Sequence, residues 1–535
     1  MIAIIVCGAA GLLLLGFVAD FFASLGDDPR EPRRLQPRVP VVGHILGLLR
    51  HGPTYYKITS TRAGAEIYTL GVLNFKVYIS ASSRLLPHIQ KQSKALSFRP
   101  FLQLTARQYG EAGPETYEIF GGELPDNLSQ SVRNSLAPGP HLDELSLRMG
   151  RRVLVDVEAL ADLGRSGTRV RLLDWARHAV VQATSCAVYG TEHPFRDPEV
   201  EEAYWGWIPY LTSHLVGWLD VTGRGYALRR RVFDAHVAYC KDLPPDASHL
   251  VREHQRTLAA AGVPAADRAK QAAIFTIASF SNSAPTLYWM LWELFSRPDV
   301  LAAVRSEVEA NAMVTVTPED ADHGDKGARK TGGGATFVLA VAALKTRCPL
   351  LLSVFQETQR TRHVNPSFRR VMADTLLDGR YLLREGAYLQ VPGNVIHGEP
   401  DLWGGSAAVF DPYRFVPGKQ RPSPAAHDDR DAAARHASGF VPWGAAPYLC
   451  PARQFAATEI LIVAALLAVR FDIRPASASA SGTWDKAPAL SISDLATLSP
   501  PKHDIEMEIS VREAWAGAWS LEMGESRSRV LLASG

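Results

Sequence analysis

Long segments with the helical spacing of apolar residues dominate this chain of 535 residues and constrain its fold most. Apolar side chains recur every three to four positions over residues 142–162, 269–295 and 339–362, which is the period of one face of an α-helix. Strand-like segments are short, at 65–70, 75–79 and 504–511. Because they rarely alternate with helices, the pattern argues against a doubly wound sheet. It predicts a mainly α-helical protein with small β-sheets.

The composition describes an ordinary globular protein in a reducing environment. The net charge is +2, so the chain lacks the basic excess that is typical of nucleic-acid binding. Charged residues make up 21% and apolar residues 47% of the chain, which excludes a disordered protein. Five scattered cysteines, an odd number, are too few for a disulfide framework.

The N-terminus predicts a membrane anchor over residues 1–25. Residues 2–19 carry no charge, which is close to the minimum length for crossing a bilayer. A cleaved signal peptide is the alternative, but no basic residue precedes the apolar run. Basic residues follow it instead, so the body is expected to face the cytosol. The glycosylation sequon at Asn127 would then stay unused.

The rest of the chain divides into a hinge, one large domain and a tail. Residues 26–50 are basic and rich in proline, and this composition favours a stiff, extended hinge. Residues 51–512 form the expected domain, interrupted by polar insertions at 317–336 and 418–438. Neither insertion contains enough apolar surface to order itself. The tail at 513–535 has no function that its sequence indicates.

Cys450 is the cysteine with the most distinctive surroundings. A loop rich in proline and glycine carries it, and an apolar helical run follows up to Val469. A helix N-terminus favours a thiolate at this position. With no second Cys or His nearby, zinc fits poorly, whereas an axial haem ligand needs a single thiolate. The alternative is a buried cysteine with no role beyond packing.

Two further segments carry charges in apolar surroundings. Glu357 and Arg360 are three residues apart on a predicted helix and can form an ion pair. Arg414 lies between two aromatic residues in a turn braced by proline, from where it could complete a buried Arg–Glu–Arg cluster. Taken singly, both segments also fit solvated surface groups.

A predicted helix is interrupted near Pro285. Its missing N–H leaves the carbonyl of Ser281 without the usual helical donor. Polar residues Asn282 and Ser283 lie at this interruption in an otherwise apolar helix. The alternative is a kinked core helix in which the serine hydroxyls bond back to the backbone.

Together and in this order, these features resemble the cytochrome P450 family over nearly the whole chain. Glu357 and Arg360 resemble its E-x-x-R motif, and Arg414 resembles the arginine of the following segment. Trp443 to Cys450 resembles the haem loop. The resemblance implies a single haem domain behind an N-terminal transmembrane helix. It also implies that Cys450 is the axial iron ligand, with Glu357, Arg360 and Arg414 structural.

The haem loop departs from the family pattern at several positions. Trp443 replaces the usual Phe, while Ala446 and Ala452 replace glycines. Tyr448 stands where the family usually has a cation that pairs with a haem propionate. The resemblance then shifts this role to Arg370 or its neighbour Arg369, with Arg370 as the choice and with Trp443 and Tyr448 as further cofactor contacts.

Over the iron, Asn282 and Ser283 replace the family's usual acid–alcohol pair. This arrangement resembles a branch that contains sterol 7α-hydroxylases, prostacyclin synthase and fungal biosynthetic enzymes. Because Ser283 keeps a hydroxyl that can relay protons, monooxygenation is favoured. An isomerase or dehydratase that works without a reductase is the alternative, and a haem-poor scaffold is a second one.

The resemblance implies haem b as the cofactor and NADPH as the electron source, through a membrane-bound NADPH–cytochrome P450 reductase. It places the protein in the endoplasmic reticulum membrane with a cytosolic catalytic domain. Apolar side chains around residues 98–105 and 205–219 indicate an apolar small-molecule substrate. The likeness to fungal enzymes suggests a role in the biosynthesis of a specialised metabolite.

Overall fold

The computed structural model describes most of the chain. The described residues are 16–18, 21–22, 24–72, 75–217, 220–316, 336–364, 366–419, 438–476, 484, 487–491, 498–525 and 527–534. Most of the predicted anchor at 1–25 lies outside them, as do most residues of the predicted insertions at 317–336 and 418–438. Within the described residues, no helix combines the length and the apolar character that crossing a membrane requires.

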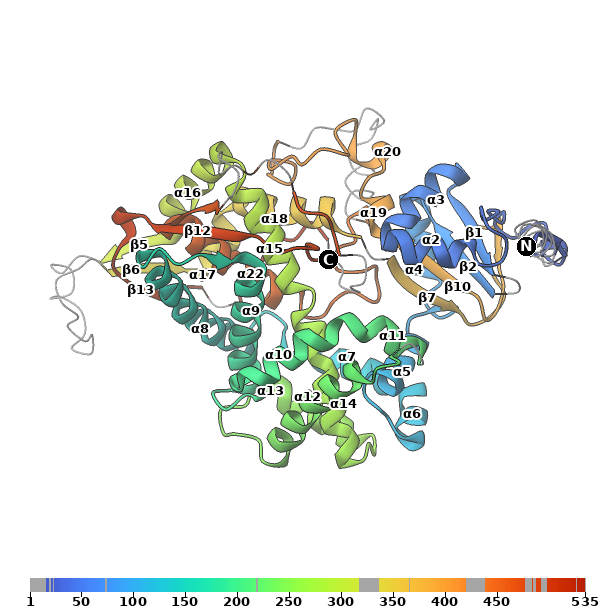
Figure 1. Cartoon of the computed structure of the whole chain (residues 1–535), viewed down its shortest axis with the longest axis horizontal. Helices are drawn as coiled ribbons and strands as arrows, with labels where there is room; N and C mark the ends of the chain where they lie inside the picture. The colour runs from blue at the N-terminus through green and yellow to red at the C-terminus, as the bar shows by residue number, and fades with distance from the viewer. Residues whose placement is uncertain are drawn as a thin grey trace, which may run out of the picture.

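Helices make up most of the described chain (Figure 1). The first half contains α2 (Gly43–His51), α3 (Tyr55–Ala63), α4 (Leu86–Lys91), α5 (Arg99–Gln108), α6 (Pro114–Gly121), α7 (Leu124–Ser135), α8 (Pro140–Arg165), α9 (Leu172–Tyr189), α10 (Pro198–Trp207), α11 (Leu211–Val216), α12 (Arg224–Lys241) and α13 (His249–Ala260). The second half contains α14 (Ala265–Phe280), α15 (Ser283–Phe295), α16 (Pro298–Ala312), α17 (Val341–Arg347), α18 (Pro349–Arg362), α19 (Gly393–Ile396), α20 (Pro400–Trp403) and α22 (Arg453–Arg470).

Within the described residues, the strands form four small sheets. The first has the order β1-β2-β10-β7-β3, with β1 (Ile67–Val72), β2 (Phe75–Ser80), β10 (Tyr388–Pro392), β7 (Pro366–Val371) and β3 (Leu96–Ser97). The others are β11 (Phe471–Pro475), β12 (Glu506–Val511) and β4 (Val170–Arg171); β13 (Ala518–Glu522), β6 (Thr336–Ala340) and β5 (Met313–Val316); and β8 (Thr375–Leu377) with β9 (Tyr381–Leu383). The prediction of a mainly helical protein with small sheets is confirmed.

Two of the predicted helices are each interrupted by a proline. Residues 269–295 form α14 and α15, with the break at Ser281 and Asn282 just before Pro285. Residues 339–362 form the end of β6, then α17 and α18, because Pro349 begins a new helix. Cys348, which precedes this proline, has φ −116° and ψ 66°, as expected when the ring disfavours the helical region for its neighbour.

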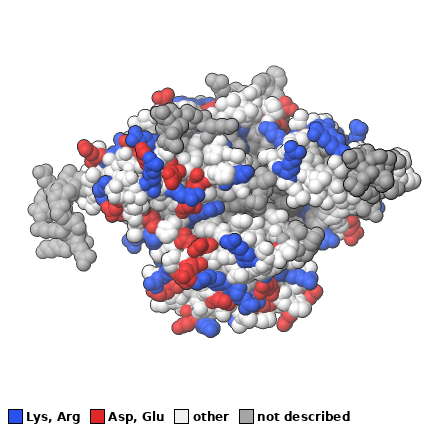
Figure 2. All heavy atoms as spheres, in the orientation of Figure 1, with Lys and Arg blue, Asp and Glu red and all other residues white. Residues whose placement is uncertain are grey.

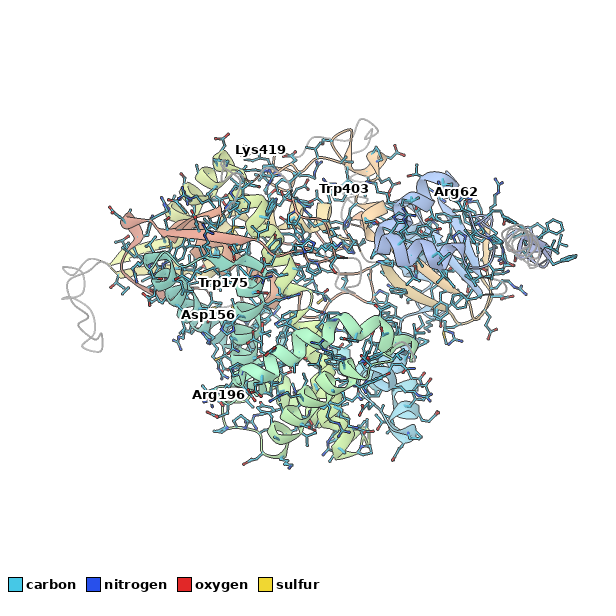
Figure 3. All side chains as sticks on the ribbon, in the orientation of Figure 1. Arg62, Asp156, Trp175, Arg196, Trp403 and Lys419 are labelled. Atoms are coloured by element: carbon cyan, nitrogen blue, oxygen red, sulfur yellow. The ribbon has the colours of Figure 1, made fainter. Side chains whose placement is uncertain are left out.

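The core has two main apolar clusters. The larger joins the long helices, including α8, α9, α15, α18 and α22. The smaller lies beside the five-stranded sheet and includes side chains of the Cys450 loop, namely Phe440, Val441 and Ala445. Trp403, labelled in Figure 3, belongs to the smaller cluster. Basic and acidic side chains are interspersed over the face shown in Figure 2, in keeping with the small net charge.

Candidate functional site

The loop that carries Cys450 folds back on itself before α22 begins. The N–H of Cys450 donates to the carbonyl of Trp443 at 2.8 Å, and the N–H of Tyr448 donates to that of Ala445 at 3.1 Å. Gly444 has φ +85°, and a Cβ there would lie 2.9 Å from the carbonyl oxygen of Tyr448. Only glycine tolerates both the backbone angle and this close approach. The loop therefore adopts one tight conformation, which places Cys450 just before the start of α22.

The Cys450 thiol experiences opposing influences. Burial raises its pKa, whereas a hydrogen bond from the backbone of Ala452 and the charge of Arg453 lower it. The sequence predicts that the helix N-terminus favours a thiolate. That influence is present, but the effect of burial is larger. A bound metal cation would remove the proton, since the thiolate is the form that coordinates a metal.

Glu357 lies between two guanidinium groups in the interior. Its side chain is 0% exposed and that of Arg360 is 1% exposed. Arg360 donates two hydrogen bonds of 2.7 Å to the carboxylate, and Arg414 Nε lies 3.1 Å from both carboxylate oxygens. The N–H of Asp411 adds a bond of 3.0 Å. The structure thus brings together the three side chains that the sequence singled out, in a buried and fully bonded cluster.

The two guanidinium groups also fasten the chain segment that precedes the Cys450 loop. Arg360 donates to the carbonyls of His397 and Ala407 at 2.6 and 2.7 Å. Arg414 donates to the carbonyl of Trp403 at 3.2 Å. Each cation therefore neutralises Glu357 and at the same time satisfies buried backbone carbonyls.

His397 connects this cluster to the Cys450 loop, and sequence reasoning did not single it out as a site residue. Its Nε2 accepts the N–H of Val441 at 3.0 Å. Burial holds the pKa of His397 well below its ordinary value, so the ring is neutral and can accept this bond. No local pattern predicts the contact, because 44 residues separate the two partners.

Arg369, rather than Arg370, faces the Cys450 loop. Neighbouring side chains on a strand point to opposite faces. The Arg369 guanidinium lies 4.7 Å from the centre of the Tyr448 ring and donates to the carbonyl of Ala445 at 3.2 Å. Arg370 is exposed, with its guanidinium 5.9 Å from the centre of the Tyr388 ring. Of the two arginines that the sequence offered, Arg369 thus lies beside the Cys450 loop, whereas Arg370, the choice from the sequence, lies on the opposite face of β7.

The groups around the loop fit a haem. Arg369 is 5% exposed and forms no ion pair within the described residues, and burial lowers its pKa to about 10. A buried cation of this kind can pair with a bound carboxylate, such as a haem propionate. The indole N–H of Trp443 is also buried without an acceptor in the described structure. With the Cys450 sulfur as a soft metal ligand, these residues could hold an iron porphyrin.

The break between α14 and α15 presents polar groups inside the helical core. Ser283 is buried, and its hydroxyl is 3.4 Å from the carbonyl oxygen of Ser279. Asn282 is half-buried, and its carbonyl accepts the Thr286 hydroxyl at 2.6 Å. The backbone-bonded arrangement that the sequence left open therefore describes the hydroxyl of Ser283, although 3.4 Å is long for such a bond.

The elements that carry these groups meet in one core. Helix α15, which begins with Ser283, packs against α18, which carries Glu357. Both helices pack against α22, which follows Cys450 directly. Four described cysteines, at positions 186, 240, 348 and 450, are free thiols.

Comparisons with known proteins agree with this site. The family model described as cytochrome P450 matches residues 341–500, which include α18, the Glu357 cluster and the Cys450 loop. The chain is 29% identical to the cytochrome P450 monooxygenase nodJ of Hypoxylon pulicicidum, with 98% of this chain and 95% of that protein covered.

Other relatives extend the comparison. A cytochrome P450 monooxygenase of Gibberella zeae is 25% identical, with 97% of each chain covered. A 5-beta-cholestane-3-alpha,7-alpha-diol 12-alpha-hydroxylase of Sus scrofa is 28% identical, with 83% of this chain and 87% of that protein covered.

Proposed function

We propose that this chain is a cytochrome P450 monooxygenase, as its similarity to proteins of that family indicates, and that it inserts one oxygen atom from dioxygen into an apolar small molecule. The observation that supports this most directly is the Cys450 loop, held in a single path beside the buried Glu357 cluster. Such a loop can present one thiolate to iron while excluding water from it.

Cys450 would hold the iron of haem b through its sulfur, and Arg369 would pair with a haem propionate. Bound haem supplies the redox chemistry with dioxygen, as it does throughout the family. The chain's own contribution is to hold the sulfur, to exclude water and to orient the substrate. Glu357, Arg360 and Arg414 serve this purpose indirectly, by fixing residues 397–409 next to the loop.

Ser283 is the proposed proton relay, with Asn282 orienting water beside it. Oxygen insertion consumes two protons, and a hydroxyl inside an apolar core can pass them from ordered water. The long bond between the Ser283 hydroxyl and the Ser279 carbonyl, 3.4 Å, supports this role. A hydroxyl held so weakly can rotate away from the backbone at little cost.

The proposed substrate class is an apolar precursor of a specialised metabolite. The names of the relatives support this, since two are monooxygenases of fungi and one is a hydroxylase of a steroid-like diol. Apolar side chains of α10 and α11 also support it, among them the buried Trp207 and Leu211.

Electron supply from a redox partner follows from the family, and NADPH–cytochrome P450 reductase is the proposed donor. The proposed location is the endoplasmic reticulum membrane with the catalytic body in the cytosol. Exposed aromatic side chains at the end of the apolar N-terminal run support this, since Phe17 within the run and Phe21 and Phe22 after it are 46%, 59% and 65% exposed.

The experiment compares metabolites of the source organism with and without the gene, in air and in isotopically labelled dioxygen. We expect a compound that disappears on deletion and carries one labelled oxygen atom, while a lighter precursor accumulates. Equal masses of the lost and the accumulated compound would instead support the isomerase alternative.

The role of Ser283 is tested in the same strain by complementation. Ser283→Ala should slow product formation and divert reducing equivalents to peroxide, because the proton relay is lost. Ser279→Ala removes a hydroxyl four residues earlier, at the end of α14, where it bonds to the carbonyl of Phe275, and serves as the matched control. Equal product from both variants would contradict the relay.

A further inference from the structure

The C-terminal end of the chain returns to the interior. Beyond β12, the chain makes a short turn, η6 (Glu513–Trp515), and then forms β13, which pairs in parallel with β6. Strand β6 in turn pairs with β5 on its other side. The predicted tail therefore completes a sheet with the strands that flank the insertion at 317–336, and the C-terminus lies in the middle of the view in Figure 1.

An aromatic cluster anchors this returning segment. The ring of Phe337 on β6 lies 4.9 Å from that of Trp515 and 5.2 Å from that of Trp519. The Arg470 guanidinium at the end of α22 lies 5.0 Å from the Trp519 ring centre. At Gly150 on α8, a Cβ would lie 3.1 Å from Leu521. The absence of a side chain at Gly150 thus leaves room for the returning segment between α8 and α22.

Residues 527–534, which we call the C-terminal strap, then bind to both helices that flank the Cys450 loop. The Gln454 side-chain amide forms two hydrogen bonds with the backbone of Val530. It accepts the Val530 N–H at 2.8 Å and donates to the Val530 carbonyl at 3.1 Å. The N–H of Ala533 donates to the Gln356 side chain at 2.5 Å. Val530 is 2% exposed and Ser534 is 3% exposed, so two side chains of the strap are buried.

Both glutamines are close in sequence to residues of the proposed haem site. Gln454 is in the first turn of α22, four residues after Cys450. Gln356 is on α18, directly before Glu357. Ala533 also packs against the smaller apolar cluster, to which Phe440 of the Cys450 loop belongs. The strap is therefore bonded on both sides of the loop and packed against it.

We propose that the C-terminal strap is a positioning element for the haem thiolate: through Gln454 and Gln356 it holds the start of α22 against α18 and keeps water from the Cys450 sulfur. This inference rests on the proposed function, in which Cys450 binds the iron. Gln454 and Gln356 are positioning residues, since they act through the loop. Without the strap, the buried Gln356 side chain and the half-buried Gln454 side chain would lose their partners, and this loss would loosen the first turn of α22.

The experiment measures the ferrous carbon monoxide spectrum of the haem-loaded protein, whose Soret maximum distinguishes a thiolate ligand from a protonated one. Two variants test the strap's bonds: a chain that ends at residue 526 loses all of them, and Gln454→Met in the full chain loses the two with Val530. Each should convert from the thiolate form to the inactive form roughly tenfold faster than the parent on warming, because each loses at least the two part-buried hydrogen bonds between Gln454 and Val530. Circular dichroism over the same temperatures reports whether the helices stay folded.

The matched control changes the strap without touching its bonds. The Leu531 side chain is 63% exposed, so Leu531→Ser should leave the conversion rate unchanged. A synthetic peptide of residues 527–535 should restore the slow rate to the shortened chain and not to Gln454→Met. Combining Gln454→Met with the shortened chain should increase the conversion rate little beyond that of the shortened chain, because both changes remove the bonds between Gln454 and Val530.

The outcomes separate the strap's role from the proposed function. If the full chain itself lacks a thiolate-type Soret band, then the proposed function fails and the strap has no thiolate to position. If the full chain shows the band and both variants convert at the parent's rate, then the strap's positioning role is overturned while the function stands. If conversion accelerates only as the helices melt, then the strap stabilises the fold generally and the inference is likewise overturned. Should the shortened chain fail to fold, Gln454→Met alone decides by the same criteria.

Discussion

At the scale of single residues, the carboxylate of Glu357 offers a sharp test, because it is fully buried between Arg360 and Arg414. Glu357→Gln removes the negative charge and leaves two buried cations without a counter-ion. We expect a loss of about 3–5 kcal/mol in the free energy of unfolding, together with loss of bound haem. Urea unfolding and haem absorbance measure these two effects.

The matched control for this prediction is Glu253→Gln on α13. Glu253 also pairs with an arginine three residues further along its helix, Arg256, but that arginine is 69% exposed. The exposed pair contributes little to stability, so the control should unfold like the parent. Equal stability of Glu357→Gln and Glu253→Gln would contradict the importance of the buried cluster.

Arg369 and Arg370 form a second pair of neighbours with opposite surroundings. Arg369→Ala should weaken haem retention, because its buried guanidinium lies against Tyr448 of the Cys450 loop. Arg370→Ala should retain haem, because that side chain is exposed beside Tyr388. Transfer of haem to apomyoglobin measures the two rates of loss, and faster loss from Arg370→Ala would reverse the assignment.

These residues also show which contacts a local sequence pattern can predict. The pairing of Glu357 with Arg360 follows from helical spacing, and the sequence could predict it. The choice between Arg369 and Arg370 depends on which face of β7 meets the Cys450 loop, and spacing along one strand does not fix that face. His397 was missed as a site residue because its partner Val441 is distant in sequence.

At the scale of elements, the contact between α9 and α22 contains a buried acid. Glu459 accepts a bond of 2.6 Å from the Thr184 hydroxyl, and burial raises the pKa of Glu459 from 4.5 to about 8. The folded chain therefore keeps a proton that the unfolded chain has already lost between these values. Stability from this group falls as pH rises through that range, by up to about 1.4 kcal/mol per pH unit.

Glu459→Gln removes this dependence, because the amide carries no charge at any pH while its oxygen can still accept from Thr184. We expect the variant to gain stability relative to the parent as pH rises from about 5 to about 8. Urea unfolding across this range measures the difference in the free energy of unfolding between the variant and the parent. Contributions from the other titrating groups are the same in both proteins and cancel in this difference. Parallel curves for the two proteins would show that Glu459 is ionised in the folded chain.

Element boundaries were predictable where a single residue decides them. The interruption before α15 follows from Pro285, which the sequence singled out. The division of residues 339–362 into a strand and two helices was missed, although Pro349 gave a signal. The apolar residues of 336–340 fit both the helical and the strand period over so short a run. They form a strand because they pair with β13.

At the scale of the whole molecule, the sequence predicted the class of fold and not the route of the chain. Pairing of β13 with β6 joins residues 182 positions apart, such as Ala518 and Thr336, and nothing local encodes such a contact. The tail at 513–535 carries no motif, yet its Val530 is among the buried residues of the larger cluster. Long-range packing of this kind is visible only once the helices are placed.

The anchor predicted for residues 1–25 makes a prediction for the intact protein. A chain that begins at residue 26 should leave the membrane fraction on alkaline extraction, whereas the full chain should stay, because the apolar run is long enough to span the bilayer. The state of Asn127 gives an independent control, since a cytosolic body leaves the sequon unmodified. Full retention in the membrane fraction of the chain that begins at residue 26, or a glycan on Asn127, would contradict the proposed topology.

The most direct test of whether Cys450 binds the haem iron is the ferrous carbon monoxide spectrum of the full chain beside that of Cys450→Ser. We expect a thiolate-type Soret band in the parent and its loss in the variant, because Cys450 provides the sulfur at the start of α22. A parent without this band, or a variant that keeps it, would show that Cys450 does not bind the iron.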